Sequence, residues 1–247
     1  MTKYIASCSG GKDSVATLII ARENGDPLDE VVYCEVMFDK ETSGEMPEHR
    51  DFIYNKVKPY VEDVLNVPFI ILRPTKTYVD VFTHICVKGK SIGKCRGFPI
   101  PGMCAINRDC KIPPITKYWK EQGGNATQYV GIAADEPKRL ARLRGTSRVS
   151  LLEKYGVTEQ DAFEICRKHG LLSPIYEFSK RNGCWFCPNC RNQEWTHLIF
   201  NHTPLFDRLI ELEINHPERA RRCLTINETA SEVKQKIIRQ GEQCSLF

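Results

Sequence analysis

The sequence predicts an α/β protein with an open, mostly parallel sheet, helices on both faces and a small, cysteine-rich helical region at the C-terminus. Two observations carry this prediction. Short apolar runs alternate with helical segments from Lys3 to Ala133, as in strand–helix–strand crossovers. The run 30–38 is apolar almost throughout, which is typical of a strand covered on both faces. We expect the α/β domain at residues 1–170 and the C-terminal region at 171–247.

The elements follow in order along the chain. A strand at 3–8 leads through a glycine turn into a helix at 15–24, which Gly25 ends because glycine adopts the left-handed conformation found after helices. Pro47 suits the first turn of a helix with apolar residues at helical spacing. Strands are also expected at 30–38, 69–72 and 128–133, and helices at 78–87, 115–122, 158–168, 193–200, 204–214 and 230–240. The stretch 89–114, rich in glycine and proline, is expected to be a functional or mobile loop.

Composition excludes several protein classes. The 247 residues are 41% hydrophobic and 27% charged, which excludes disordered, collagen-like and fibrous proteins. No apolar run has the roughly 18 to 20 residues that a membrane helix needs, and no secretory signal precedes the first strand. We therefore expect a cytoplasmic protein without membrane contact. Residues 88–148 hold thirteen Lys and Arg but four acidic residues, which favours a polyanionic partner or, alternatively, a solvated basic face.

The turn after the first strand is the strongest local signal. Two glycines between a strand and a helix let the backbone approach a ligand and direct its N–H groups outward. The helix N-terminus adds partial positive charge and Lys12 adds a full charge, a combination that suits a pyrophosphate group. The predicted binding residues are Ser9, Gly10, Gly11, Lys12, Asp13 and Ser14.

Twelve cysteines suggest a metal centre. Cys184, Cys187 and Cys190 are separated by two-residue gaps in a turn-rich segment, so their thiolates can converge on one centre. Zinc and a [4Fe–4S] cluster both fit four thiolates. The candidates for the fourth ligand are Cys95, Cys104 and Cys110, all in the long middle loop.

Four segments together resemble a known family. Ser-Gly-Gly-Lys-Asp-Ser at 9–14 is joined by Phe38-Asp39 with the Pro-Glu pair at 47–48, by Met103-Cys104 with Lys111 and Pro113, and by Gly-Ile-Ala-Ala-Asp-Glu-Pro-Lys-Arg at 131–139. These segments resemble the PP-loop ATP pyrophosphatases (adenine nucleotide alpha hydrolase-like fold), and most closely the phosphoadenosine phosphosulfate (PAPS) reductase-like branch. The resemblance extends from about residue 3 to 190. One departure is Ala133, where the family usually has arginine.

The resemblance implies roles for individual residues. The loop would hold the phosphates of ATP, with Lys12 and Asp13 acting in catalysis, and Asp39 would lie near the nucleoside or Mg²⁺. Gly131, Asp135 and Glu136 would contact the nucleotide or Mg²⁺, with helix capping as the alternative for the two acids. Arg139 and Arg142 would neutralise phosphate charge during catalysis, with a solvated helix face as the alternative. Cys104 becomes the first choice as fourth metal ligand, and the [4Fe–4S] cluster is favoured over zinc because related sulfur-transferring proteins use one.

The intact loop favours an enzyme that cleaves ATP to AMP and pyrophosphate and adenylylates an acceptor, in sulfur transfer or in nucleotide or nucleic-acid modification. Candidate partners are an adenine nucleotide, tRNA or DNA as acceptor, and a sulfur donor protein; a homodimer is one candidate assembly. The first alternative is a reductase of PAPS or APS. That branch has a Glu-Cys-Gly-Leu-His motif, whereas Cys244 here lacks these neighbours. The second alternative is a zinc-containing nucleic-acid-binding module with a vestigial loop.

Overall fold

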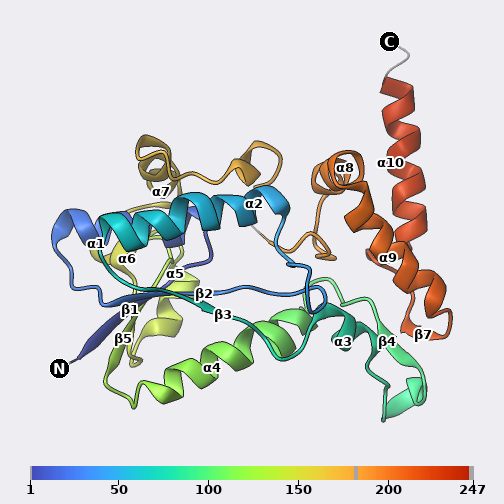
Figure 1. Cartoon of the computed structure of the whole chain (residues 1–247), viewed down its shortest axis with the longest axis horizontal. Coiled ribbons are helices and arrows are strands. Elements are labelled where there is room, and N and C mark those ends of the chain that lie inside the picture. Colours follow the sequence, from blue (N-terminus) through green and yellow to red (C-terminus); the bar gives the residue numbers. More distant parts are fainter. Residues whose placement is uncertain (1, 181–182, 245–247) are drawn as a thin grey trace. The chain divides into compact units, whose positions relative to one another are not determined.

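The chain forms two compact units (Figure 1). A computed structural model describes residues 2–180 and 183–244, with the backbone only for 242–244. The first unit comprises Met1–Glu35, Met46–Arg73 and Pro114–Asn182, and the second comprises Val36–Glu45, Pro74–Pro113 and Gly183–Phe247. Each unit therefore combines segments that are distant in the sequence, whereas the sequence predicted two consecutive parts with a boundary after residue 170.

The first unit contains a five-stranded sheet in which all neighbouring strands are parallel. This finding confirms the predicted α/β class. The strand order is β3 (Phe69–Leu72), β2 (Glu30–Cys34), β1 (Lys3–Ser7), β5 (Ala126–Val130) and β6 (Arg148–Val149). The predicted strand 30–38 ends early, at Cys34, because its partner β3 ends at Leu72. The last backbone bond there runs from the amide of Glu35 to the carbonyl of Leu72, and the chain then enters the second unit.

Helices cover both faces of this sheet (Figure 1). One face packs against α1 (Lys12–Asn24), α6 (Leu151–Lys154), α7 (Glu159–Lys168) and α2 (Pro47–Phe52), which continues in wider turns through Ile53–Val57 and Tyr60–Val64. The other face packs against α4 (Ile112–Glu121) through Tyr118 and Trp119. Alternation along β1 directs Ala6 into the first layer and Ile5 into the second, as the two-residue period of a strand requires.

Local signals set the helix ends in this unit. Gly25 ends α1 in the left-handed conformation with φ 67°, as predicted. The side chains of Thr158 and Asp161 each bond the other's backbone amide at the start of α7, a capping box that sets the start of the helix predicted at 158–168. The short helix α5 (Pro137–Leu140) follows β5 by a few residues.

The second unit contains a smaller, two-stranded parallel sheet formed by β4 (Cys95–Gly97) and β7 (Arg219–Arg221). Its helices are α3 (Tyr78–Thr83), α8 (Asn192–Asn201), α9 (Thr203–Asn215) and α10 (Ala230–Cys244), of which the last three pack on one another. The middle loop 89–114 thus contributes a strand and a helical turn at Asn107–Lys111, which the sequence did not predict. None of the helices in the described part of the chain is both long and apolar enough to span a membrane.

Candidate functional site

The topology of the first unit has a switch point between β1 and β5. The chain adds β2 and β3 on one side of β1, then returns to the other side to form β5 and β6. In open parallel sheets, ligands bind at such a switch point, beyond the carboxyl ends of the strands. The turn at 9–14 follows β1 and the turn at 131–136 follows β5. The sheet thus brings together two of the segments that carry the family resemblance.

The turn after β1 is held in one conformation by its own side chains. The hydroxyl of Ser14 donates to the carbonyl of Gly11 (2.8 Å) and accepts from the amide of Ser9 (3.1 Å). Gly10 has φ +73°, and a Cβ there would lie 2.6 Å from the side chain of Ile53. Glycine is required at position 10 on both grounds.

The two turns touch each other at Gly131. A Cβ at that position would lie 2.6 Å from the backbone nitrogen of Ser14 and 2.7 Å from the carbonyl carbon of Asp13. Both atoms belong to the backbone at the start of α1, so they cannot move aside without displacing the turn. Gly131 therefore sets the close approach of the β5 turn to the predicted phosphate-binding turn.

His49 supports the first turn from the protein interior. The residue is fully buried, its Nε2 lies 3.0 Å from the carbonyl oxygen of Ser9, and its Nδ1 lies 2.8 Å from the hydroxyl of Ser173. A neutral ring with its proton on Nε2 satisfies both contacts, donating to the carbonyl and accepting from the hydroxyl. His49 thereby ties the turn to the segment that begins at Ser173, a contact that the sequence did not reveal.

The N-terminus of α1 presents donors suited to an anion. The first amides of a helix have no partner within it, and together with the helix dipole they attract negative charge. The amide of Lys12 donates to the hydroxyl of Tyr176 at 2.9 Å. Burial raises the pKa of Tyr176, so the residue is neutral at this contact. The tyrosine oxygen thus occupies one acceptor position at the predicted phosphate site.

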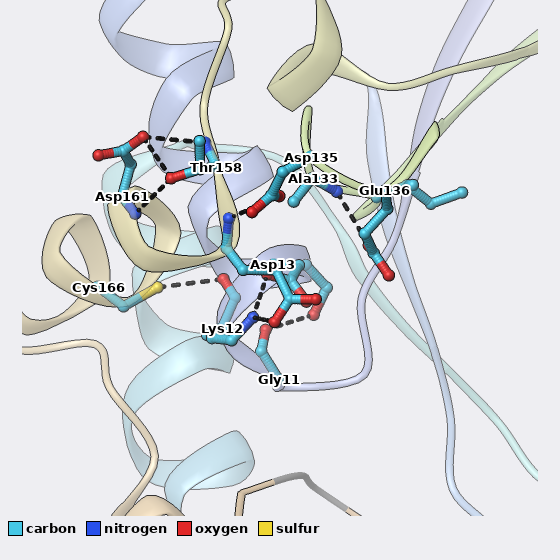
Figure 2. Close-up of polar contacts among 12 residues, drawn as sticks. Gly11, Lys12, Asp13, Ala133, Asp135, Glu136, Thr158, Asp161 and Cys166 are labelled. Carbon is cyan, nitrogen blue, oxygen red and sulfur yellow. Dashed lines mark hydrogen bonds and ion pairs between the residues drawn. The ribbon is translucent and has the colours of Figure 1, made fainter. Parts of the chain in front are cut away.

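Charged groups are concentrated beside this amide (Figure 2). The ammonium of Lys12 lies 2.7 Å from Asp13 Oδ1 and 3.2 Å from Glu159 Oε2. Burial lowers the pKa of Lys12, but both carboxylates outweigh that effect and raise it overall. Burial and the nearby charges of Glu159 and Glu136 raise the pKa of Asp13 against the opposing effect of Lys12. Acidic groups therefore outnumber the single ammonium at the mouth of the turn.

The other predicted residues of the first unit have local partners. Asp135 Oδ1 accepts from the amide of Glu159 (3.0 Å). Glu136 accepts from the amide of Ala133 (3.2 Å), as Figure 2 shows. Glu136 also pairs with Arg139 (2.6 Å). In this arrangement the two acids bond backbone amides, as in the capping alternative. Arg139 and Arg142 are exposed, as in the solvated-face alternative.

Asp39 belongs to the second unit and organises a turn there. Its Oδ1 accepts from the amides of Glu41 (2.9 Å) and Thr42 (2.6 Å), and its Oδ2 accepts from the guanidinium of Arg208. Burial raises the pKa of Asp39, but the two amides and Arg208 lower it overall. Arg208 was not predicted, because it comes from α9, far along the chain.

The predicted metal ligands lie on two successive turns in the second unit. The amide of Cys187 donates to the carbonyl of Cys184 (3.0 Å), and the amide of Cys190 donates to that of Cys187 (2.9 Å). Between them, the indole of Trp185 donates to the carbonyl of Ser43 (2.9 Å). Phe186 packs on Tyr78 with 4.2 Å between ring centroids. Aromatic packing thus fixes the backbone that carries the thiols.

The donor set fits a metal chemically but does not form a closed tetrahedron. Burial, followed by the charges of Glu45 and Cys187, raises the pKa of Cys184 well above its usual range, and the charge of Cys104 adds to this effect. No three of the sulfur atoms of Cys104, Cys184, Cys187 and Cys190 lie within 4.8 Å of one another, whereas zinc bonds of about 2.3 Å would hold them about 3.8 Å apart. Binding of a single zinc ion would require these side chains to turn toward one centre.

The two other candidates for the fourth ligand lie in different surroundings. Cys110 is fully buried, and burial with the charge of Asp109 raises its pKa to about 12. Cys95 lies in β4, where its main charged neighbour is Arg219. Cys104 is exposed. The thiol of Cys244, relevant to the reductase alternative, is not described, because the structure gives only the backbone there.

Comparisons with known proteins add one structural likeness. The sequence matches no protein-family profile and no curated protein. Among solved structures, the chain is similar to the U34-tRNA thiolase NcsA from Methanococcus maripaludis, solved with its [4Fe–4S] cluster. The sequences are 17% identical, the alignment covers 98% of this chain and 72% of that chain, and the TM-score is 0.42. A likeness at this level assigns no residue and no activity to the present chain.

Proposed function

We propose that the protein is a PP-loop enzyme that binds ATP with Mg²⁺ and cleaves it to AMP and pyrophosphate, adenylylating an acceptor for sulfur transfer or nucleic-acid modification. The observation that carries the proposal is the position of residues 9–14. A glycine turn, a helix N-terminus and Lys12 meet at the switch point of a parallel sheet, the place where such sheets bind nucleotides.

The residues of the turn supply the binding chemistry. The amides at the start of α1 would hold the pyrophosphate oxygens, with one of them replacing the hydroxyl of Tyr176 on Lys12. The ammonium of Lys12 would pair with the same group and stabilise the charge that develops as pyrophosphate departs. Gly10 allows the turn to pack closely on Ile53, and Gly131 allows the β5 turn to pack closely on the backbone of Asp13 and Ser14, so both glycines help to hold the turn in place.

The reaction follows from this placement. An oxygen of the acceptor attacks the α-phosphorus, and a new P–O bond forms as the bond to the bridging oxygen breaks. Pyrophosphate leaves with the electron pair. A hydrosulfide sulfur, supplied by a donor, then attacks the activated acceptor carbon and loses its proton, and AMP leaves with the C–O bonding electrons. The acceptor oxygen therefore ends in AMP, and sulfur takes its place.

Two inorganic groups fit the residues present. Mg²⁺ prefers oxygen ligands from one or two carboxylates together with substrate phosphates. Asp13 is the carboxylate best placed to supply one, because it lies beside Glu136 and Glu159 in a region of surplus negative charge. The thiols of Cys184, Cys187, Cys190 and Cys104 would hold a [4Fe–4S] cluster, which could carry sulfur or electrons, or alternatively zinc.

Pyrophosphate release from ATP tests the proposal. Wild-type protein with Mg²⁺ and candidate acceptors, including bulk tRNA, should release pyrophosphate, and Lys12→Ala should reduce the rate by at least about a hundredfold. Lys117→Ala removes an exposed ammonium from α4 and serves as the matched control. Reduction of PAPS or APS without ATP cleavage would instead support the reductase. Salt-sensitive RNA or DNA binding without any nucleotide binding would support the nucleic-acid-binding module.

A further inference from the structure

The second unit contains a cavity that the proposed ATP chemistry does not use. Its volume is about 780 Å³, within the range of small-molecule sites. The walls come from the end of β4 and the residues after it, and from β7 and the residues after that. Gly97 makes this junction possible, because a Cβ there would lie 2.2 Å from the carbonyl oxygen of Arg221. The cavity is therefore formed by the junction of the two strands of this sheet.

The cavity is strongly basic. Four arginines line it, Arg96, Arg108, Arg221 and Arg222, and none of the lining residues is acidic. Asp109 pairs with both Arg96 (2.9 Å) and Arg108 (2.6 Å), so two of the four arginines share one carboxylate, which offsets one positive charge. Within the described ranges, Arg221 and Arg222 have no carboxylate partner, and the buried Nε of Arg221 has no hydrogen-bond acceptor. The net charge of about +3 is available to a ligand.

The remaining walls are apolar. Pro99, Ile100, Met103 and Ile226 line the same cavity, and Met103 and Ile226 are 73% and 75% exposed. Large apolar side chains at this exposure contribute little to the core, but they can cover a flat organic group. Arginine forks match phosphate oxygens in pairs and also stack on planar rings. The combination suits a ligand that joins a phosphate to a flat base.

We propose that this cavity binds a nucleotide, with Arg221 and Arg222 holding its phosphate and the apolar wall contacting its base. The nucleotide can be free or part of a nucleic-acid strand. In the proposed reaction, the cavity is the binding site for the acceptor. This role rests on the proposed function, whereas nucleotide binding in the cavity does not. The cavity also includes Cys104, a candidate metal ligand, so a bound acceptor would lie beside that centre.

Fluorescence anisotropy of the full chain with an end-labelled, single-stranded RNA of mixed sequence tests this proposal. Arg221→Gln with Arg222→Gln should weaken binding at least about tenfold. The slope of log affinity against log salt should fall by about 0.7, because the two arginines hold one phosphate and each neutralised phosphate on a single strand contributes about 0.7. Lys88→Gln with Lys90→Gln is the matched control, since both lysines are exposed in the same unit and outside the cavity. This control should change binding much less.

Competition distinguishes the two sources of the nucleotide. Displacement of the RNA by excess pyrimidine mononucleotide would show that one free nucleotide fills the cavity. Displacement by unlabelled RNA only would show that a strand is required. Arg221→Lys with Arg222→Lys keeps both charges and tests the paired geometry if the glutamine variant does not fold. It should retain the salt slope and lose affinity severalfold.

Two results would overturn the proposal: glutamine variants that bind the RNA as tightly as wild type, or wild-type protein that binds neither probe. These failures differ from failure of the proposed function. If the protein binds RNA through Arg221 and Arg222 but never cleaves ATP, the proposed cavity site stands and the proposed ATP chemistry is wrong. A chain that cleaves ATP but binds RNA independently of both arginines shows the reverse.

Discussion

The backbone amide of Lys12 donates a 2.9 Å hydrogen bond to the hydroxyl of Tyr176, which lies 164 residues further along the chain. This amide opens α1 and belongs to the turn that we propose binds pyrophosphate. A tyrosine oxygen and a phosphate oxygen therefore compete for this single N–H donor. The contact therefore links nucleotide affinity to a residue outside the sequence motif.

Tyr176→Phe is expected to tighten ATP binding by about fivefold, because one competing hydrogen bond contributes about 1 kcal/mol. Titration calorimetry with ATP and Mg²⁺ measures the change. Tyr155→Phe is the matched control, because its hydroxyl bonds Asp26 and not the turn. Weaker binding by Tyr176→Phe would mean that the tyrosine positions the turn for the nucleotide and does not compete with it.

Gly131→Ala is expected to weaken ATP binding at least about tenfold and to lower the thermal midpoint. The new Cβ would meet the backbone of Asp13 and Ser14 and push the two turns apart. Gly145→Ala provides the comparison, since its Cβ would enter open space and carries only the cost of a left-handed backbone, about 1 kcal/mol. Equal ATP affinities for both variants would show that the close approach at Gly131 does not shape the site.

Serine substitutions test the metal centre. Anaerobically purified wild-type protein should be brown, absorb at about 400 nm and contain about four iron atoms per chain. Cys184→Ser, Cys187→Ser, Cys190→Ser and Cys104→Ser should each lose most of the iron, whereas Cys95→Ser, Cys110→Ser and the control Cys86→Ser should keep it. Colourless protein with one zinc per chain would exclude the cluster but leave the assignment of the four cysteine ligands unchanged. Iron retained by Cys104→Ser would move the fourth ligand elsewhere.

Asp109 gives the cavity wall a defined pH dependence. Hydrogen bonding by Arg108, reinforced by Arg96, lowers the pKa of Asp109 to about 2, below the unfolded value of about 3.9. Its stabilisation is therefore complete above about pH 4 and is lost as the pH falls through about 2. Urea unfolding should show Asp109→Asn less stable than wild type at neutral pH, with the difference disappearing in acid. Asp63→Asn, exposed on the surface, should show no such difference, and a pH-independent deficit in Asp109→Asn would contradict the ion-pair explanation.

Features with local causes were predictable from the sequence. The strand and helix around residues 9–14, the end of α1 at Gly25 and the start of α7 at Thr158 all follow from residues within a few positions of one another. The parallel α/β class was predictable from the alternation of strands and helices along the sequence. The predicted ends of β2 and α3 were wrong by a few residues because pairing with distant segments overrides local propensity there. β2 ends with its partner β3, and after α3 the chain pairs at Ile85 with Cys95.

Contacts between distant residues were not predictable. Tyr176, Glu159 and His49 meet the turn across 164, 147 and 40 residues, and no motif marks them. The parallel pairing of β4 with β7 joins Cys95 to Arg219 across two three-residue strands, which are too short to show a pattern. The cavity that these strands form could not be predicted for the same reason. Two of its arginines, Arg96 and Arg108, do belong to the charge surplus at 88–148.

The products formed from ATP show whether residues 9–14 bind pyrophosphate during the reaction. Phosphorus-31 NMR of ATP, Mg²⁺ and bulk tRNA incubated with anaerobically purified protein should show AMP or adenylylated acceptor together with pyrophosphate. The same signals should be absent with Lys12→Ala and present with Lys117→Ala. Formation of ADP and inorganic phosphate, or equal pyrophosphate release by Lys12→Ala, would contradict the assignment of residues 9–14 as a pyrophosphate-binding turn.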